Sequence, residues 1–597
     1  MDIRCSLKIF VICVLQIANP LLAQQDSSFR KEWSDFKGFN SANIPSALYT
    51  GEVSSASNVI LKNGVIETAL GISSVSTPTN PTGCVFRGMV PFQNNSKQTL
   101  VYWCSNFGSW QEMDTSNNTS YLTYGVGESS ANAALTTIYG TVGTENWGSH
   151  IKLGDYFKCA SAADSAYTEI SAVVSNSSLT LASAYGGSGS CDSPGGTYVI
   201  RKTLAGITAG VSGRNFYQGS MLNGWAMLVT GTENPEFYDG TTLFTNVNIA
   251  SVAVVTTYKN RWFAANSPGS LDNLYWSPVN STATWNTTAT EPIFSSDGSG
   301  GIVSIVADDT SLVVFKRFGK IYRVYGEFSS AVGRPDTILE VPTSFTLGEV
   351  APKTVIKYNN AIWFITTTGL YSLRSNEVKL MGRNFQSDID RACITDAVCN
   401  MGNQWQVFSG VFDNNLYINL NDSLVLIDSD GNPIQRASLG DSLAGGFGNF
   451  NNNFYSSNET SALRVLRLEV PNDYTLYDDD GSTNAVNINY ISESYCADAP
   501  EHQKEFKDFY ILYQTDSSSA TVGLNEILFD AVVDEKNTYM AVSSITTNDT
   551  ESGRINYYQH RVGTRGNCIR WRIRENDRGR RNRIRSVVLR GNYLNLR

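Results

Sequence analysis

Thirteen arginines lie in residues 554–597, where there is no lysine and only two acids, so this segment carries a local charge of +11. The whole chain carries −10, which leaves −21 (−10 minus +11) for all other residues. Arg570, Arg572 and Arg574 alternate with apolar residues, so a strand here would put three guanidiniums on one face, suited to binding carboxylate or phosphate. The lack of lysine and the acidic remainder favour contact with an acidic neighbouring subunit over binding of DNA. The candidate subunit-interface residues are Arg570, Arg572, Arg574, Arg580, Arg581 and Arg583.

Residues that commonly catalyse reactions or bind metals do not form a known pattern in this sequence. The three histidines, His150, His502 and His560, are far apart, and there is no H-E-x-x-H, G-x-S-x-G or phosphate-binding G-x-x-x-x-G-K-[ST] motif. An acidic run at 478–481 resembles the start of a calcium loop, but Thr483 and Asn489 stand where further acids would be needed. The sequence therefore predicts no catalytic residue, no metal and no cofactor. A hydrolase built on two converging carboxylates stays open as an alternative, because sequence spacing cannot show such a pair.

The cysteines and the N-terminus indicate an oxidising compartment. Residues 1–23 resemble a secretory signal, with Arg4 and Lys8 before an apolar run and a possible cleavage point after Ala23. Eight cysteines follow, and an even number agrees with disulfide formation, although eight cysteines allow 105 connectivities and free buried thiols are the alternative. No later run of about 18 apolar residues predicts a membrane-spanning segment. The hypothetical pairs, each within one segment of the chain, are Cys84/Cys104, Cys159/Cys191, Cys393/Cys399 and Cys496/Cys568.

The composition predicts an all-β protein. Charged residues are only 17%, against about 25% in an average domain. Their place is taken by small polar residues, 49 glycines, 29 tyrosines, 27 phenylalanines and 11 tryptophans. Strands favour aromatic and β-branched residues, and tight turns need Gly, Asn and Asp. This composition excludes a coiled coil and a long-helix bundle.

A recurring motif predicts a β-propeller of about six blades. Each copy has an apolar or aromatic residue, then two or three Asn, Asp, Gly or Lys residues, then an alternating apolar strand, which is a strong signal of a hairpin. A hairpin unit every 40–50 residues or so is typical of propeller blades, each of which must bury both faces against its neighbours. An array of β-sandwiches with accidental spacing is the alternative. The copies begin at Leu222, Tyr258, Ala307, Tyr358, Phe412 and Phe450.

The segments around these motifs predict further domains. Short strands separated by turns suggest a small β-barrel inserted at 146–204. Longer strands at the end of the chain suggest a C-terminal β-sandwich. The predicted organisation is a signal-like segment at 1–23, an N-terminal β region that helps to close the propeller at 24–145, the inserted barrel at 146–204, the propeller at 205–470, and the sandwich with its Arg-rich end at 471–597.

Several motifs in a fixed order resemble the nozzle (tail tubular B-type) proteins of short-tailed bacteriophages. They begin with a stretch at 39–67 and continue with Asn234–Gly240, Asn260–Ala265, Leu274–Ser277 and the segments 312–325 and 351–373. The resemblance covers about residues 35–597, and it depends on the order of the motifs because each alone is degenerate.

The resemblance implies a non-enzymatic virion protein located in the tail. It implies a hexameric ring of copies, which lies below the portal and adaptor and carries tail fibres or receptor-binding proteins. Double-stranded DNA would pass through the channel without specific binding, and an acidic wall would suit this passage because like charges repel. The signal-like segment and the paired cysteines keep an alternative open, namely a secreted or periplasmic propeller that binds glycans or a protein partner.

Overall fold

The computed structural model describes most of residues 28–594, with gaps at 40–51, 75–85, 203–217, 391–406, 518–525 and 547–554 and at several shorter stretches. It divides into two compact units, one of residues 69–486 and one that combines residues 1–68 with 487–597. The predicted signal-like segment, the acidic turn at 478–481 and the cysteines Cys84, Cys393 and Cys399 lie outside the described residues.

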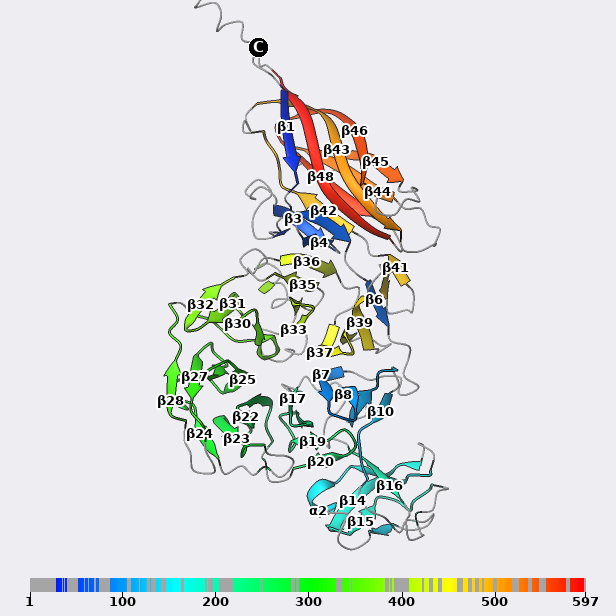
Figure 1. Cartoon of the computed structure of the whole chain (residues 1–597), viewed down its shortest axis with the longest axis vertical. Helices are drawn as coiled ribbons and strands as arrows, with labels where there is room; N and C mark the ends of the chain where they lie inside the picture. The colour runs from blue at the N-terminus through cyan, green and yellow to red at the C-terminus, as the bar shows by residue number, and fades with distance from the viewer. Residues whose placement is uncertain are drawn as a thin grey trace, which may run out of the picture. The chain divides into compact units, whose positions relative to one another are not determined.

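The described part of residues 69–486 forms seven sheets that follow one another along the chain and around a ring (Figure 1). The first sheet is β7 (Phe86–Gln93), β8 (Gln98–Cys104), β9 (Ser109–Met113) and β10 (Thr119–Tyr121). The second is β17 (Gln218–Leu222), β18 (Trp225–Val229), β19 (Glu236–Tyr238) and β20 (Leu243–Thr245). The third is β21 (Val254–Tyr258), β22 (Arg261–Ser267), β23 (Ser270–Trp276) and β24 (Thr290–Pro292).

The next three sheets have the same strand order. The fourth is β25 (Ile302–Ala307), β26 (Leu312–Lys316), β27 (Ile321–Tyr325) and β28 (Thr337–Glu340). The fifth is β29 (Ile356–Tyr358), β30 (Ala361–Thr366), β31 (Gly369–Arg374) and β32 (Glu377–Leu380), preceded by a 3-10 turn at Pro352–Thr354. The sixth is β33 (Val407–Phe412), β34 (Asn415–Leu420), β35 (Ser423–Ile427) and β36 (Pro433–Ser438).

The seventh sheet closes the ring with strands from both ends of this unit. Its order is β37-β38-β39-β6-β40-β41, so the early strand β6 lies between strands that come about 400 residues later. The inner strands then complete the circle, since β37 contacts β7 and β7 contacts β17. The strands are β37 (Leu443–Phe450), β38 (Asn453–Asn458), β39 (Val465–Val470), β6 (Gly71–Ser74), β40 (Thr475–Tyr477) and β41 (Thr483–Ala485).

The hairpins at the start of the blades follow directly from the recurring motif. A two-residue type I′ turn needs positive φ at both central residues, which Asn and Gly tolerate best. Five turns between a first and a second strand have this geometry. They are Asn223-Gly224, Lys259-Asn260, Asn359-Asn360, Asp413-Asn414 and Asn451-Asn452, with φ values between 46° and 80°.

Apolar clusters between neighbouring sheets hold the ring together. One cluster joins Phe263 and Trp276 of the third sheet to Leu312 and Tyr322 of the fourth. Similar clusters join the first sheet to the second and the second to the third. The strands β26 and β30 are buried at every position because both of their faces meet a neighbouring sheet. The unit is therefore a β-propeller with seven blades.

The prediction of about six blades was one blade too low. The first blade lies before the inserted segment, and its hairpin turn does not use the motif. Asn94 instead begins a longer turn, in which its side-chain oxygen accepts hydrogen bonds from the N–H groups of Ser96 (2.9 Å) and Lys97 (2.7 Å). Asparagine commonly stabilises such a turn without positive φ.

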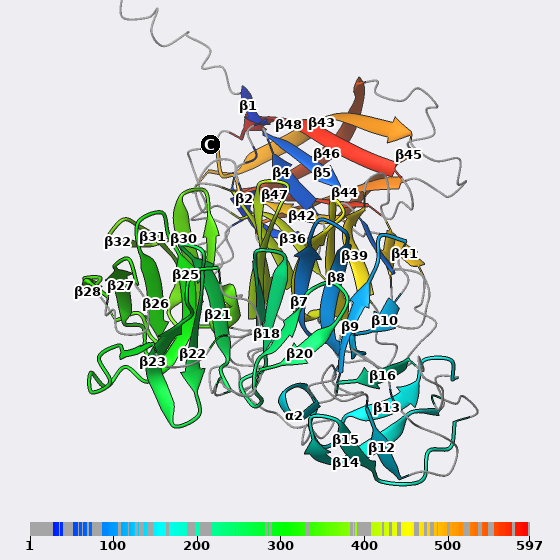
Figure 2. The ribbon, with the colours of Figure 1, turned by 60° about the horizontal axis from the view of Figure 1, so that its bottom comes forward.

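A six-stranded antiparallel sheet is inserted between the first and second blades, with the order β11-β16-β13-β14-β15-β12. All six strands contribute to one buried cluster, as in a small barrel, and the Cys159–Cys191 disulfide belongs to that cluster. The short helix α2 (Trp147–His150) and the sheet lie beside blade strand β20 in both views (Figures 1 and 2). The strands are β11 (Thr123–Tyr124), β12 (Thr137–Tyr139), β13 (Tyr156–Cys159), β14 (Thr168–Ser175), β15 (Ser178–Leu181) and β16 (Tyr198–Arg201).

The other unit is a β-sandwich built from both ends of the chain. One sheet includes β4-β5-β48-β43-β46, with β1 also paired to β48, and the other has the order β2-β3-β42-β47-β44-β45. Phe509 and Phe529 meet between the sheets at a ring-centroid distance of 4.8 Å, and Trp33 contacts Trp571 at 5.8 Å. The early strands are β1 (Ser28–Trp33), β2 (Gly38–Phe39), β3 (Glu52–Ser57), β4 (Val59–Lys62) and β5 (Val65–Thr68). The late strands are β42 (Ile488–Ser492), β43 (Lys504–Ser517), β44 (Glu526–Val533), β45 (Met540–Thr546), β46 (Ile555–Gly566), β47 (Ile569–Glu575) and β48 (Arg580–Tyr593).

These boundaries differ from the predicted ones in two places. Strands β1–β5 belong to the sandwich rather than to the propeller region, and the inserted sheet already begins at Thr123 rather than at 146. Both differences arise because the strands pair with partners that are distant in sequence, such as β1 with β48.

Candidate interaction surface

The C-terminal sandwich presents one open sheet face, formed by β43, β46 and β48. Alternating residues of a strand point to opposite faces of the sheet. In β43, Phe509 and Ile511 are buried in the core, so Asp508 and Tyr510 lie on the outer face. The register pairs Tyr510 with Gln559 of β46 and with Val588 of β48, which places these three residues on the same face.

Tyrosine and arginine side chains gather on this outer face. The rings of Tyr510 and Tyr557 stack at 5.5 Å, and the guanidinium of Arg590 lies 4.7 Å from the Tyr510 ring centroid. Tyr557 is 63% exposed, and Arg561, Gln559 and Arg590 are exposed as well. We call Tyr510, Tyr557, Gln559, Arg561 and Arg590 the Tyr/Arg face. Tyr and Arg are enriched at protein interfaces because they offer large contact areas with directional polar groups.

The strand β46 ends the ladder of its sheet among the described residues. It is paired on one side, with β43, and its side chains alternate between exposed and half-buried along most of its 12 residues. Burial lowers the pKa of its His560 below the ordinary value, with Asp508 opposing this effect. Among the described residues the strand is therefore the last of its sheet, a position that natural proteins usually cover with another chain or protect with charge.

The predicted interface arginines lie on two strands, β47 and β48. Arg570, Arg572 and Arg574 share a face of β47, as the alternation predicted, but β47 and β48 belong to different sheets. The guanidiniums of Arg572 and Arg574 both bind Oδ2 of Asp530, each at 2.8 Å, and the Asp530 side chain is only 3% exposed. These two arginines thus neutralise a buried acid of their own sheet.

The remaining predicted arginines belong to β48. Nε of Arg583 lies 3.0 Å from Oε1 of Glu67, which is on the paired strand β5. The backbones of Arg580 and Arg581 pair with β43, whereas their side chains lie outside the described residues. The outer Tyr/Arg face was missed because its members lie on three strands. Its one sequence signal is the alternation of Ile555, Tyr557, Gln559 and Arg561.

Replacing Arg572 and Arg574 with Gln is expected to destabilise the sandwich by about 2 kcal/mol. Removing the partners of a buried charge costs about 3–5 kcal/mol, and the partial exposure of the two arginines (22% and 41%) reduces this cost. Hydrogen exchange of the backbone amides in β44 and β47 measures the change within the sandwich. The matched control is Arg590→Gln on the outer face, for which we expect a change within about 0.5 kcal/mol. An equal loss in the control would show that the contacts of Asp530 are not responsible.

The cysteines form two of the four hypothetical pairs among the described residues, Cys159–Cys191 and Cys496–Cys568. Cys104 belongs to β8, and its side chain is outside the described residues. Within the described ranges, no three His, Cys, Asp or Glu side chains are grouped so that they could hold a metal ion. No helix in the described part of the chain has the length and hydropathy needed to cross a membrane.

No known protein family and no curated protein matches this sequence. Among solved structures, the chain is similar to YCF48 from Cyanidioschyzon merolae, at 11% identity over 67% of this chain and 98% of that chain, with a TM-score of 0.35. It is also similar to the Pan2 WD40 domain from Neurospora crassa (6% identity, 67% and 95% covered, TM-score 0.34). A third is virginiamycin B lyase from Staphylococcus aureus with Quinupristin (10% identity, 67% and 99% covered, TM-score 0.29). The strand order of its own seven sheets defines this chain as a β-propeller protein.

Proposed function

We propose that this chain is a non-enzymatic structural protein of a bacteriophage tail. Copies of the chain form a ring that continues the DNA exit channel and carries tail fibres or receptor-binding proteins. The ring has six copies, the number implied by the resemblance to the nozzle proteins. At the end opposite the fibres, the ring contacts the portal and adaptor. Double-stranded DNA passes through the channel without specific binding. The proposal is supported by the ordered motifs that resemble the nozzle proteins, including Asn234–Gly240 in the second blade.

The observation that carries the proposal is the Tyr/Arg face on and beside β46, the last strand of its sheet among the described residues. In the assembly it contacts an acidic surface of the next copy. Residues 554–597 carry +11 while the rest of the chain carries −21, so each copy offers both charges. Complementary charge of this kind guides association and fixes orientation more than it adds affinity. An exposed strand edge that another copy covers would also no longer be open to aggregation.

Light scattering of the purified chain, with negative-stain imaging of the same fraction, tests the proposal. We expect a ring of about six copies. The double variant Tyr557→Ala/Arg561→Glu is expected to shift the mass to that of a monomer without lowering the melting temperature, because both side chains are exposed. The matched control, Leu339→Ala/Lys379→Glu, changes one exposed apolar residue and one exposed cation on outer strands of two propeller blades. It should keep the ring.

A wild-type chain that stays monomeric would contradict the ring and favour the second candidate, a secreted or periplasmic propeller that binds glycans or a protein partner. The observation in favour of that candidate is the two disulfides, which persist in oxidising compartments. If the double variant still forms rings, the Tyr/Arg face is not the contact between copies, whereas the ring itself is not contradicted.

A further inference from the structure

A polar cavity of about 570 Å³ opens where the first and second blades meet. Three turns line it, namely the β7–β8 turn at 93–96, the β17–β18 turn with Trp225, and Asp239 directly after β19. In an antiparallel blade, the turn after the first strand and the turn after the third lie at the same end of the sheet. The cavity therefore lies on one face of the ring. Its lining residues are Gln93, Asn94, Asn95, Ser96, Asn223, Gly224, Trp225 and Asp239.

Hydrogen bonds within the turns hold the cavity in shape. Nδ2 of Asn94 donates to the Asp239 carbonyl at 2.7 Å and so links the two blades. Oδ1 of Asp239 accepts from the N–H groups of Thr241 and Thr242 at 2.8 and 2.7 Å. A side chain at Gly240 would approach Nδ2 of Asn94 to 2.7 Å, which shows how closely the turns meet. A preformed site loses less entropy when it binds a ligand.

Several polar groups remain available to a ligand. Within the described residues, the side-chain amides of Gln93 and Asn95 have no hydrogen-bond partner, and Oδ2 of Asp239 has none either. The Trp225 indole is half-buried, and its ring is held in place by Phe244 at a centroid distance of 5.7 Å. The site therefore combines a fixed aromatic surface with amide donors and with amide and carboxylate acceptors.

The chemistry of the lining selects among classes of ligand. An anion finds no free cation among the described lining residues, and the nearby Lys97 ammonium is bound to Glu112 (2.6 Å) and to the Tyr238 hydroxyl (2.7 Å). A purely apolar ligand would leave the amides and the carboxylate unpaired, which is costly. A sugar has neighbouring hydroxyls that both donate and accept, and its C–H face can pack on an indole. The volume lies within the ~300–1,000 Å³ of small-molecule sites.

We propose that this cavity binds a neutral saccharide, with Trp225 packed against a sugar ring and Gln93, Asn95 and Asp239 bonded to its hydroxyls. The inference goes beyond the proposed structural role and does not depend on ring formation, and it gives a place to the glycan binding of the second candidate function. It concerns a different part of the molecule from the Tyr/Arg face, so light scattering and sugar binding can fail separately.

Saturation-transfer NMR on the full chain tests the site. The probes are the methyl glycosides of glucose, galactose, mannose and N-acetylglucosamine, together with maltose and lactose. We expect transfer to the ring protons of at least one probe. The variant Gln93→Ala/Asn95→Ala, whose exposed side chains form no hydrogen bond with a described residue, is expected to fold normally and to weaken that binding at least tenfold. Trp225→Ala should abolish the binding, whereas Trp225→Phe should retain part of it.

The matched control is Phe318→Ala, which removes an exposed aromatic ring from the fourth blade and should leave binding unchanged. No transfer to any probe would overturn the proposal, and so would equal binding by the wild type and the Gln93→Ala/Asn95→Ala variant. Stronger binding of glucose 6-phosphate than of methyl glucoside would also overturn it, because the lining offers no free cation.

Discussion

Replacing Cys496 and Cys568 with Ser is expected to lower the free energy of unfolding of the sandwich by about 4 kcal/mol. The disulfide joins residues 72 apart, and in the chain-entropy treatment the cost of closing a loop in the unfolded state grows with its length. The bridge ties the segment after β42 to the start of β47, where Tyr495 and Ile569 also pair through their backbones.

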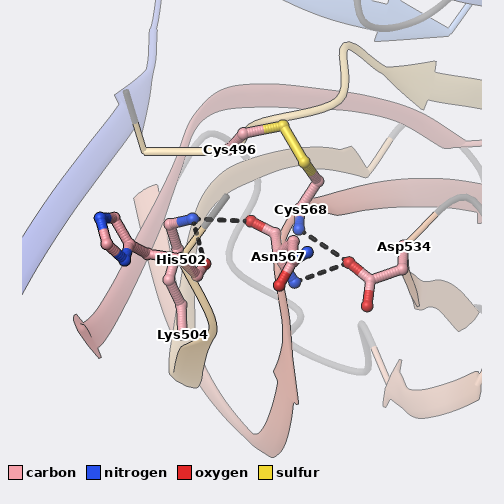
Figure 3. Close-up of a disulfide and its surroundings, with 6 residues drawn as sticks. All are labelled: Cys496, His502, Lys504, Asp534, Asn567 and Cys568. Carbon is pink, nitrogen blue, oxygen red and sulfur yellow. Dashed lines mark hydrogen bonds between the residues drawn. A yellow bond between two sulfur atoms is a disulfide. The ribbon is translucent and has the colours of Figure 1, made fainter. Parts of the chain in front are cut away.

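The surroundings of this disulfide show which contacts depend on it (Figure 3). Oδ1 of Asp534 accepts hydrogen bonds from the N–H groups of Asn567 (2.6 Å) and Cys568 (2.9 Å). Nζ of Lys504 donates to the carbonyls of His502 and Asn567 at 2.8 and 2.9 Å. Three strands, β43, β44 and β47, are therefore held at this end of the sandwich by a small polar cluster next to the bridge.

Hydrogen exchange of the backbone amides in β42 and β47 measures the effect within the sandwich. A local measurement is needed because a chain with two units does not unfold in two states. A loss of 4 kcal/mol corresponds to roughly 1,000-fold faster exchange from globally opened states. The matched control is Cys159→Ser/Cys191→Ser, which should speed exchange in β13 and β16 of the inserted sheet and leave β42 and β47 unchanged. Unaltered exchange in β42 and β47 of the first variant would show that the bridge does not stabilise the sandwich.

Local features of the fold were predictable where a turn imposes its geometry on a few residues. Asn359-Asn360 and Asn451-Asn452 have positive φ at both positions, and the same dipeptides had predicted hairpins. The inserted strands at Tyr156–Cys159 and Ser178–Leu181 lie within the segment for which short strands were predicted, because alternation and turn residues mark them.

Pairing across long distances could not be predicted in this way. The strand β6 completes the seventh blade with β39, nearly 400 residues later, and β1 pairs with β48 across almost the whole chain. The residues of β6 carry no signal for their partner, since any exposed strand can complete a sheet. The allocation of the early strands to two different units depended on such pairings.

The same limit applies to the candidate interaction surface. Alternation showed that Arg570, Arg572 and Arg574 share a face, but it could not show that Asp530, about 40 residues earlier, lies on the adjacent strand. The alternation of side chains along a strand shows on which face of the sheet each side chain lies. It does not show which residues of the adjacent strands lie beside it. The Tyr/Arg face and the cavity at Trp225 likewise assemble residues from separate strands or blades.

Replacing Glu236 with Gln is expected to stabilise the propeller by about 3 kcal/mol at pH 8. Glu236 lies in β19, is 2% exposed, and neither of its carboxyl oxygens has a hydrogen-bond partner among the described residues. The nearby ammonium groups are bound elsewhere, since Lys202 pairs with Asp155 at 2.7 Å and Lys152 with Glu233 at 2.6 Å. Burial therefore raises the pKa of Glu236 from 4.5 to about 7, although Lys152 and Lys202 oppose the shift.

The sign of the pH dependence follows from this raised pKa. Below pH 4.5 the carboxyl is protonated in both the folded and the unfolded state, so its ionisation does not change the free energy of unfolding. Between pH 4.5 and 7 the unfolded chain releases its proton first, so stability falls as the pH rises and the full loss is reached above pH 7. A difference of 2.5 pKa units corresponds to about 3 kcal/mol. Gln resembles the protonated carboxyl in shape and charge, so the variant avoids this loss.

Hydrogen exchange of the backbone amides in β18 and β19, compared between wild type and variant at pH 5 and again at pH 8, measures the difference in the propeller alone. The gain should be small at pH 5 and about 3 kcal/mol at pH 8. Glu340→Gln, on the exposed outer strand β28, serves as the control and should leave the pH dependence unchanged. If Glu236→Gln were equally stabilising at both pH values, the cause would be packing rather than ionisation. A loss of stability at pH 8 would mean that the ionised carboxylate is held by Lys152 and Lys202 and that their attraction exceeds the cost of burial.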